Sequence, residues 1–438
     1  MTSPWTAERI LALAPDPASA KAGQGLANPR KWVSLGQSDR VLWGECQGSG
    51  ASPYQTQIDL SEPAFKCSCP SRKFPCKHGL GLFLLLGPSA PTARGTPPEW
   101  VTKWIASRDQ KQQAKKEKAE KPPEVADPAA QAKRAADRVA KVMAGMEDLR
   151  TWLRDLVRNG FASVPADSRT FEQCAARLID AQAPGAARMV RELAALRSAG
   201  EEWPSRMLEQ AASLFLLLEA FGRLNDLPAG TQADVRTLLG LSLREDEVLA
   251  GESFREHWMV LGQKIEEEDR LRTIRTWLLG QASGRAALLL EFSYTGQPLK
   301  STLIPGLRFD ADLVFYPSNF PLRALIKQRH SGSVPLDAGA GHPDIDSALH
   351  AYGTALARHP WLERCPMPLQ QVSIVRHHNR WAICDNARRV LPLSPRYPHG
   401  WELLALSGGA PISLFGEFDG RFISPFSIIS EGAFHAFA

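Results

Sequence analysis

Four side chains of the kinds that bind zinc lie close together near residue 70. Two cysteines stand one residue apart, and a third cysteine and a histidine repeat that spacing a few residues later. Three thiolates and one imidazole make a complete tetrahedral ligand set for Zn²⁺. Ordinary buried thiols or a disulfide are the alternative, but four ligands in so short a window favour a metal site. The sequence therefore predicts one structural zinc ion with the ligands Cys67, Cys69, Cys76 and His78.

The spacing of the ligands indicates the backbone that must bring them together. Residues i and i+2 of an extended strand point to the same side, so Cys67 and Cys69 can bind one ion from a strand end. Residues two apart on a helix face different ways, so we expect Cys76 in the loop that Pro75 ends. His78 then lies in the first turn of a helix that runs to about residue 86. The predicted module is a strand, a short knuckle and a helix closed around one metal ion.

The charged residues around the ligands are all cations. No carboxylate lies between Pro63 and Pro98. Cations beside cysteines lower the thiol pKa and so favour the thiolate form that binds metal. The same cations are the candidate contacts for a nucleic acid or an acidic partner: Lys66, Arg72, Lys73 and Lys77.

The pattern Cys-x-Cys, a short insert, then Cys-x-His and an apolar helix resembles the SWIM zinc finger. The resemblance covers roughly residues 40–90, with all four ligand positions filled. It implies a structural zinc ion in a module that binds DNA or proteins. The layout, with the finger ahead of long helical and β-rich regions, is similar to that of bacterial SWIM proteins of unknown function. Some of those are encoded beside AAA-type ATPases and von Willebrand A proteins, so the resemblance implies an ATPase of this kind as a partner.

The composition is typical of a cytoplasmic multidomain protein. A chain of 438 residues is too long for one ordinary core. Residues 1–20 lack the basic start and apolar core of a signal peptide, and the longest apolar run, 80–87, is too short to span a bilayer. Seven cysteines, three of them in the metal motif, fit a reducing cytoplasm better than a disulfide framework. We interpret the other four as buried small hydrophobes: Cys46, Cys174, Cys365 and Cys384.

Positive charge gathers in one segment. Between Lys103 and Lys141 there are 11 Lys or Arg and 6 Asp or Glu, an excess of five that equals the net charge of the whole chain. Such runs are usually solvated linkers or helix faces, which is the interpretation we favour. Contact with phosphates or with an acidic partner is the alternative.

The pattern of apolar residues and helix breakers predicts an α+β multidomain chain. A small zinc-bound ββ(β)α finger comes first, a helical domain lies in the middle, and a β-rich domain with one inserted helix follows. The predicted ranges are 1–105 for the N-terminal region, 106–130 for a basic, proline-containing linker that is partly helical at best, 131–283 for the helical domain and 284–438 for the β-rich domain.

Individual elements follow from the same patterns. Beside the zinc helix we expect a sheet of three strands, at 40–46, 54–59 and 65–69. A short helix at 6–13 precedes prolines and glycines that break the pattern. The expected helices of the middle domain include 170–182, 185–198, 204–225, 229–240 and 253–279. The expected strands of the last domain are 286–294, 307–316, 371–376, 380–384, 401–406, 412–418 and 421–429, with a helix at 345–358 and hairpin turns at 378–379 and 419–420.

No catalytic machinery can be identified in the sequence. Four protein ligands leave no position on the zinc for an activated water. The chain lacks the His-x-Glu and Pro-Cys-x-x-Cys motifs of zinc deaminases, the Gly-x-x-x-x-Gly-Lys phosphate loop and the Gly-x-Ser-x-Gly elbow. We therefore expect no enzymatic activity and no small-molecule substrate, and any ATP hydrolysis would have to come from a partner.

Two other clusters of polar residues have simpler interpretations. Four consecutive acids at 266–269 lie on a predicted helix, where adjacent residues do not converge, so a solvated face is favoured over an acid–base site. Six C-terminal histidines have no cysteine or carboxylate at a metal spacing, and we interpret them as polar surface residues. They are His330, His342, His350, His359, His377 and His378.

Together these features favour a zinc-stabilised interaction module that acts as an adaptor, with a protein as the expected partner and no membrane association. DNA or RNA binding through the basic knuckle and linker is the first alternative, and it predicts a steep dependence on salt. An enzyme whose site in the β-rich domain has no recognisable motif is the second alternative.

Overall fold

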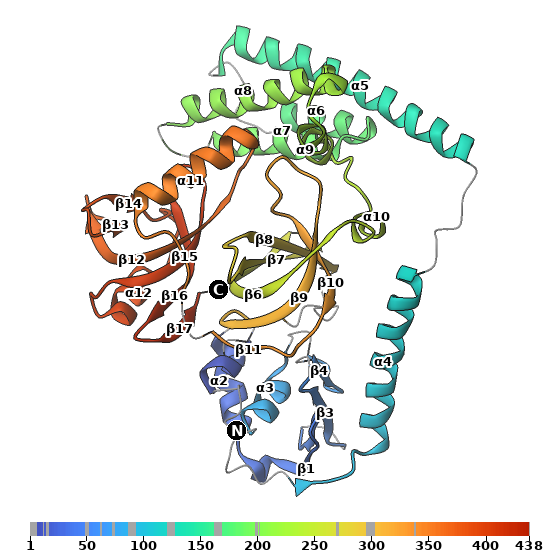
Figure 1. The fold of residues 1–438 in the computed structure, drawn as a ribbon, viewed down its shortest axis with the longest axis vertical. Helices are drawn as coiled ribbons and strands as arrows, with labels where there is room; N and C mark the ends of the chain where they lie inside the picture. Colours follow the sequence, from blue (N-terminus) through green and yellow to red (C-terminus); the bar gives the residue numbers. More distant parts are fainter. Residues whose placement is uncertain are drawn as a thin grey trace.

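The protein consists of a sheet module, a helical bundle and two further β-sheets (Figure 1). In the view of Figure 1 the bundle lies at the top, the N-terminal module at the bottom and the two C-terminal sheets between them. The α+β organisation with a finger, a helical middle and a β-rich end is therefore confirmed. The computed structural model describes residues 7–11, 13–14, 17–48, 52–61, 64–71, 75–85, 93–120, 128–161, 169–197, 200, 202–268, 271–294, 303–336 and 339–437.

The N-terminal module is a five-stranded sheet with helices on both faces. Its strands are β1 (Trp32–Gln37), β2 (Val41–Cys46), β3 (Tyr54–Asp59), β4 (Ala64–Cys67) and β5 (Ala93–Arg94), in the order β4-β3-β2-β1-β5. Its helices are α1 (Ala7–Leu11), α2 (Pro17–Leu26), α3 (Lys77–Leu84) and α4 (Glu99–Glu120), with a 3-10 turn η1 (Pro29–Lys31). Of these strands only β5, which pairs with β1, runs parallel to its neighbour.

The side chains of β2 point alternately to the two faces of the sheet, and both faces are covered by helices. Leu42 packs in a core with α3, whereas its neighbours Val41 and Trp43 pack against Val101 of α4. Successive strand residues point to opposite faces, so a continuous apolar run is what a strand buried on both sides requires. The zinc helix α3 and the long helix α4 thus lie on opposite faces of one sheet.

Two glycines let α2 pack closely against α3. A Cβ at Gly23 would lie 2.7 Å from the Cβ of Leu80, and one at Gly81 would lie 2.6 Å from the Cβ of Leu26. The prolines and glycines of this segment predict a break in helical structure, and this prediction is wrong for residues 17–26, which form α2. The glycines are tolerated in the helices because close helix–helix contact offsets their low helix propensity.

The sheet is larger than the three strands expected. β1 was not predicted, since Gly36 in its middle weakens a strand pattern. That glycine lies opposite Trp43, and a Cβ there would lie 2.5 Å from the indole ring. The glycine therefore provides room for the cross-strand tryptophan.

The segment predicted as a linker is mostly helical where the structure describes it. α4 continues to residue 120, and the next helix, α5 (Pro128–Asn159), begins after residues 121–127, which lie outside the described residues. Lys, Gln, Glu and Ala are good helix formers, so the basic run continues the helix that packs on the sheet at its start.

The middle of the chain is a helical bundle, as predicted up to about residue 240. Its core includes Leu149 and Leu153 of α5, which recur at helical spacing with other buried residues. The helices that follow α5 are α6 (Arg169–Asp180), α7 (Pro184–Leu196), α8 (Trp203–Gly222), η3 (Leu224–Asp226), α9 (Ala229–Leu239) and α10 (Glu245–Leu249).

The predicted helix at 253–279 is wrong. This segment forms an antiparallel pair, β6 (Ser253–Glu268) and β7 (Leu271–Gly280). Its Glu, Arg, Leu and Gln residues have good helix propensity, but β6 pairs with a strand on each side and buries Trp258, which donates a hydrogen bond to the carbonyl of Ala311. Long-range pairing overrides the local preference.

The β-rich part consists of two six-stranded sheets. The first has the order β10-β9-β6-β7-β8, with β11 on β9, and the second has the order β14-β13-β12-β15-β16-β17. The first sheet adds β8 (Ala286–Tyr294), β9 (Leu307–Phe315), β10 (Ala324–Arg329) and β11 (Val334–Pro335). The second contains β12 (Cys365–His377), β13 (Arg380–Cys384), β14 (Val390–Pro392), β15 (Ile412–Phe418), β16 (Ile423–Ser430) and β17 (Ala433–Ala436).

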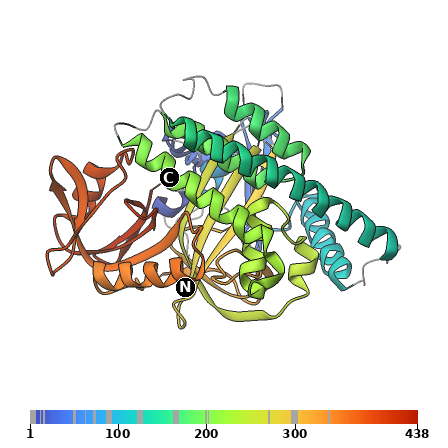
Figure 2. The same cartoon turned by 90° about the horizontal axis from the view of Figure 1, so that it is seen from above.

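Two helices accompany the second sheet. α11 (Ile345–Arg358) has the predicted bounds and begins where the Asp344 carboxylate accepts the backbone N–H of Ser347. The predicted strand at 401–406 is wrong, because residues 400–407 form α12 (Gly400–Ser407). Glycine at position 408 ends α12 in the left-handed conformation, with φ of +57°. Figure 2 shows the second sheet at one side of the molecule, where Phe415 and Phe426 pack against Trp277 of the first sheet.

The bundle and the β-rich part are joined by buried contacts. Trp361 packs in the bundle core, and its indole N–H donates to the carbonyl of Ser213 at 3.0 Å. The buried carboxylate of Asp234 accepts the backbone N–H of Asn319 at 3.1 Å. None of the described helices has the length and apolar character needed to cross a membrane.

Candidate metal centre

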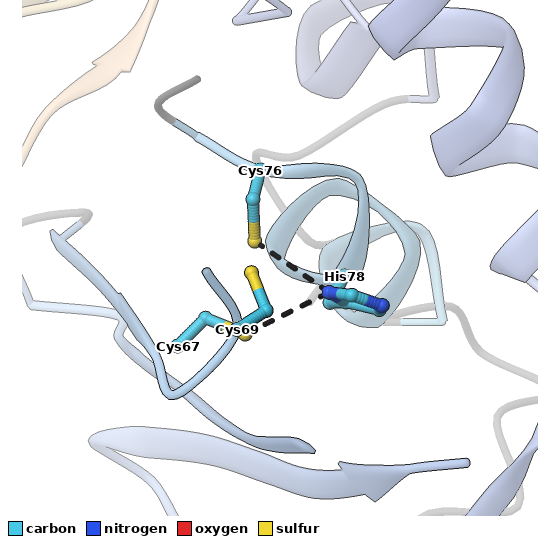
Figure 3. A group of neighbouring side chains, drawn as sticks. All are labelled: Cys67, Cys69, Cys76 and His78. Atoms are coloured by element: carbon cyan, nitrogen blue, oxygen red, sulfur yellow. Dashed lines mark hydrogen bonds between the residues drawn. The ribbon is translucent and has the colours of Figure 1, made fainter. Parts of the chain in front are cut away.

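The four predicted ligands converge between the end of β4 and the start of α3 (Figure 3). Cys67 is the last residue of β4, and Cys69 lies in the loop that follows it. Cys76 is the N-cap of α3, and His78 is the second residue of that helix. Their ligand atoms all lie within 4.8 Å of one another. The predicted strand, knuckle and helix therefore bring the ligands together, although β4 ends at Cys67 and Cys69 does not lie on the strand that was expected at 65–69.

The distances fit a tetrahedral zinc ion. With Zn–S bonds of about 2.3 Å and Zn–N bonds of about 2.0 Å, tetrahedral ligand atoms lie about 3.6–3.8 Å apart. The Nδ1 atom of His78 lies 3.8 Å from Sγ of Cys67 and 4.0 Å from Sγ of Cys76. Three sulfurs and one nitrogen at this separation suit one zinc ion, which Cys67, Cys69, Cys76 and His78 would hold as a closed set.

Cys76 has a second role as the cap of the zinc helix. Its Sγ accepts the backbone N–H of Gly79 at 3.4 Å, which satisfies one of the free donors of the first turn. The partial positive charge at a helix N-terminus also favours the thiolate form. Capping and metal binding therefore require the same side chain in the same place.

Two residues of β3 support the ligands, and neither was predicted. The hydroxyl of Thr56 lies 3.2 Å from Sγ of Cys67, and the ring of Tyr54 lies 5.0 Å from that of His78. Thr56 pairs directly with Cys67 in the β3–β4 register. This pairing could have been predicted by placing a hairpin turn directly after residue 59 in the sequence, because the length of the turn sets the register of the two strands.

The thiols and the imidazole interact strongly with one another. Hydrogen bonds from Cys67 and Cys76 lower the pKa of Cys69 well below its usual range, while hydrogen bonds with Cys67 and Cys69 raise the pKa of Cys76. For His78, burial lowers the pKa, but hydrogen bonds to Cys67 and Cys69 outweigh it and raise the pKa to about 9. The cluster thus favours one thiolate beside a protonated imidazole, and a metal ion that binds there must displace protons.

Cys46 lies close to the centre but is not one of the clustered ligands. Its thiol contacts the backbone carbonyls of Lys31 and Gln47, and burial raises its pKa. It therefore behaves as the small buried residue that was expected. Cys174 and Cys365 are also buried, and Cys384 is half-buried.

The predicted cationic contacts are placed only in part. Lys66 on β4 and Lys77 at the start of α3 are exposed, and each is next to a ligand in the chain, although Lys66 points to the other face of β4 from Cys67. Arg72 and Lys73 lie outside the described residues. The described part of the knuckle thus presents two ammonium groups to solvent.

In the described part of the chain, the other polar clusters do not form a second metal centre. Among the described residues, the four-ligand group is the only group of His, Cys, Asp or Glu that could hold a metal. Three of the acids that were expected on a helix, residues 266–268, lie at the end of β6, where Glu266 pairs with Lys264 and Glu267 pairs with Arg272; Asp269 lies outside the described residues. The C-terminal histidines are exposed or half-buried, and His330 bonds Asp312 at 2.8 Å.

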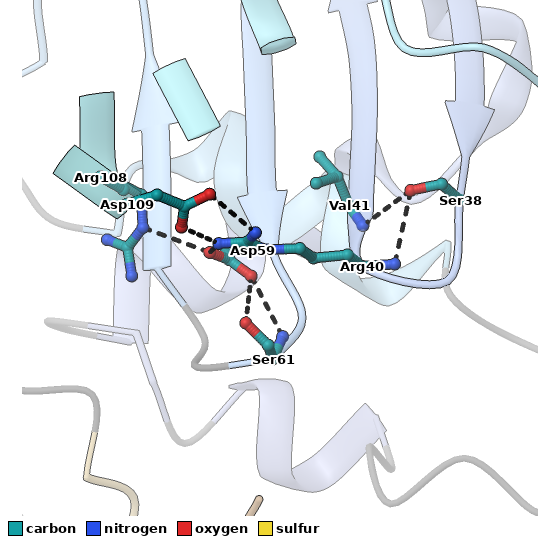
Figure 4. A network of polar contacts seen from close by, with 7 residues as sticks. All are labelled: Ser38, Arg40, Val41, Asp59, Ser61, Arg108 and Asp109. Atoms are coloured by element: carbon teal, nitrogen blue, oxygen red, sulfur yellow. Dashed lines mark hydrogen bonds and ion pairs between the residues drawn. The ribbon is translucent and has the colours of Figure 1, made fainter. Parts of the chain in front are cut away.

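A polar network behind the zinc face attaches α4 to the sheet (Figure 4). Asp59, 1% exposed, accepts hydrogen bonds from Arg108 of α4 at 3.2 Å and from the hydroxyl of Ser61 at 2.6 Å. Arg40 bridges Asp59 to Asp109 of α4, with its Nη2 atom 2.6 Å from the Asp109 carboxylate. The network fixes the strand whose other face carries Thr56 and the metal centre.

These features define a zinc-finger module followed by a helical bundle. Residues 54–87 match the family model of the SWIM zinc finger, and residues 137–239 match that of the SWIM-associated four-helix bundle domain. The chain therefore carries a SWIM zinc finger, as the resemblance implied, together with the four-helix bundle domain that is associated with it. Comparison with curated proteins and with solved structures finds no match.

Proposed function

We propose that this chain is a non-enzymatic adaptor whose zinc-stabilised finger docks a protein partner. The closed ligand set supports the proposal: four protein ligands within 4.8 Å of one another leave a tetrahedral ion no position for substrate or water. A metal bound in this way stabilises the fold of the knuckle rather than carrying out chemistry. The metal ion then contributes to function by fixing the shape of the surface around β4 and the start of α3.

The proposed docking surface is the knuckle and not the zinc helix. α3 is buried from His78 to Phe83 and packs against the sheet and α2, so it has no free face to offer. Lys66 and Lys77 are exposed, each next to a ligand in the chain, and give the knuckle a positive charge. A partner segment with acidic side chains complements this surface.

The resemblance to bacterial SWIM proteins motivates an AAA-type ATPase as the partner. The sequence of this chain contains no phosphate-loop motif, so ATP hydrolysis would belong entirely to that partner. The role of the chain in such a pair would be to connect the ATPase with its target.

Affinity purification of the intact protein and of two cysteine variants tests the proposal. Cys76→Ser removes a zinc ligand, whereas Cys384→Ser alters a half-buried thiol in β13. We expect the intact protein and Cys384→Ser to retain zinc and the same protein partner, and Cys76→Ser to lose both. The same partner on all three proteins, or recovery of nucleic acid alone, would contradict the adaptor role.

A charge reversal that spares the metal sharpens the test. Lys66→Glu with Lys77→Glu should keep the zinc ion but weaken the complex, because it reverses the charge that faces an acidic partner. Lys327→Glu, an exposed change on β10, is the matched control. An undiminished complex with the double variant would exclude the knuckle as the docking surface.

A further inference from the structure

The far end of the second C-terminal sheet carries an exposed tryptophan among arginines. Trp401 of α12 is 70% exposed, the largest exposure of any large hydrophobic residue in the described chain. It lies beside Trp381 of β13, with ring centroids 4.9 Å apart and planes at 84°. We call Arg376, the half-buried Trp381 and Trp401 the Arg–Trp surface, together with two exposed arginines near them in the chain, Arg380 at the start of β13 and Arg396 in the loop before α12.

The indole rings of this surface are held by the fold. Gly400 begins α12 against Trp381, and a Cβ at this glycine would lie 2.2 Å from the indole nitrogen. On the other side the Arg376 guanidinium lies over the Trp381 ring at 4.8 Å and donates to the carbonyl of Asn379 at 2.8 Å. Arg376 and Trp381 are direct cross-strand partners in β12 and β13. The fold therefore fixes the position of Trp381, against which Trp401 packs.

The charge around these rings is strongly positive. Residues 376–401 contain five arginines and one acid, Asp385. That carboxylate is buried and accepts backbone N–H groups of Ile345 and Arg389, so it does not face the surface. In the part of the chain that the structure describes, no carboxylate lies within ion-pair distance of Arg380 or Arg396.

Nearby acids neutralise little of this charge. Asp346 pairs with Arg389 at the opposite end of β13, and Glu402 bonds His399 at 2.8 Å. In Figure 1 β13, β14 and α12 lie at the left edge of the molecule, away from the helical bundle and the N-terminal module. The surface is thus accessible to a large ligand.

We propose that the Arg–Trp surface binds single-stranded nucleic acid. An exposed indole offers its face to an unpaired base, and every base can stack on it. Arg380 and Arg396 have no carboxylate partner in the described chain, and guanidinium groups bind phosphates with paired hydrogen bonds. A duplex hides its base faces, so stacking on Trp401 selects single strands. This surface lies apart from the zinc finger, and the inference is independent of the proposed adaptor role.

Fluorescence anisotropy with a labelled 20-nucleotide oligo(dT) and the full-length protein tests the inference. We expect binding at 50 mM salt that weakens as salt rises, and weaker binding of a duplex of equal length. Trp401→Ala should raise the Kd roughly 5- to 150-fold, the change expected for the loss of one stacked base. Trp401→Phe should restore much of the affinity, because it retains an aromatic face.

Matched variants separate this surface from others. Tyr294→Ala removes an aromatic residue that is 64% exposed on β8, and it should leave the Kd unchanged. Arg380→Gln with Arg396→Gln should reduce the slope of log Kd against log salt by about 1.4, since each phosphate contact on a single strand contributes about 0.7. Arg223→Gln, an exposed change after α8, should not alter the slope.

Any one of five results would overturn the inference. The first three are no binding of the oligonucleotide at 50 mM salt, equal affinity for single strand and duplex, and an unchanged Kd in Trp401→Ala. The fourth is displacement of the oligonucleotide by poly-glutamate at equal charge concentration, which would indicate an acidic protein as the ligand. The fifth is loss of binding in Cys76→Ser alone, which would instead place the nucleic-acid site on the finger.

Discussion

Replacing Cys76 by serine removes one zinc ligand and little else. Serine is a preferred N-cap, so its hydroxyl can still accept the Gly79 N–H that Cys76 accepts in α3. The helix start is therefore preserved, and the effect of the change reports on the metal. Few ligand substitutions separate these two roles so well.

The expected loss can be worked from the ligand count. Structural zinc ions in finger peptides bind with about 10–16 kcal/mol at neutral pH, so an equal share for each of four ligands is about 3 kcal/mol. A loss of about 3 kcal/mol raises the Kd for zinc more than 100-fold. Because metal binding is coupled to folding of the knuckle, the same free energy is lost from residues 64–85.

The rest of the module has its own core and should stay folded. Val41 and Trp43 of β2 are buried against Val101 of α4, on the face of the sheet that lies away from the metal. We therefore expect local unfolding of the knuckle in Cys76→Ser, with β1 to β3 retained. Hydrogen exchange should become faster in 64–85 and stay slow in the strands, while Cys384→Ser behaves as the unmodified protein. Unchanged exchange and unchanged zinc content in Cys76→Ser would refute the ligand assignment.

Three further predictions concern the surroundings of the centre. Thr56→Val removes the hydroxyl that contacts Cys67 at 3.2 Å and should weaken zinc binding about 10- to 100-fold, measured by competition with a chelator. An unchanged zinc affinity would contradict a supporting role for Thr56. Asp59→Asn removes the charge that Arg108 and Arg40 share and should destabilise the packing of α4 on the sheet by about 2 kcal/mol, read as faster hydrogen exchange in residues 99–110. Zinc affinity should rise with pH up to about 9. Burial lowers the pKa of His78, but hydrogen bonds to the thiols outweigh this and raise the pKa to about 9, and the proton must leave before zinc binds. A zinc affinity that stays constant from pH 6 to 9 would exclude this competition.

The metal centre could be predicted because its information is local. All four ligands lie within twelve residues, and the strand and helix that carry them follow from spacing alone. Thr56 lies eleven residues before Cys67 and is identified only when the hairpin register is worked out. Predicting the residues that support a site therefore requires the pairing of the strands as well as the sequence pattern.

The errors arose where distant contacts decide the structure. Residues 253–279 have helix-forming side chains, yet β6 lies between β7 and β9 and cannot be assigned from its own sequence. Gly23 and Gly36 suggest breaks, but each makes room for a partner that lies far along the chain, Leu80 and Trp43 respectively. The short apolar run at 401–406 fits a strand or a buried helix equally well, since periodicity cannot separate them at this length.

Metal analysis of the purified, full-length protein tests the central claim most directly, combined with alkylation of thiols under native conditions. Cys67 and Cys69 are half-buried, so protection of their thiols would come from the metal rather than from burial alone. We predict one zinc ion per chain, with both thiols resistant to alkylation until a chelator is added. Protein that contains no zinc, with both thiols alkylated at once in the native state, would contradict the account.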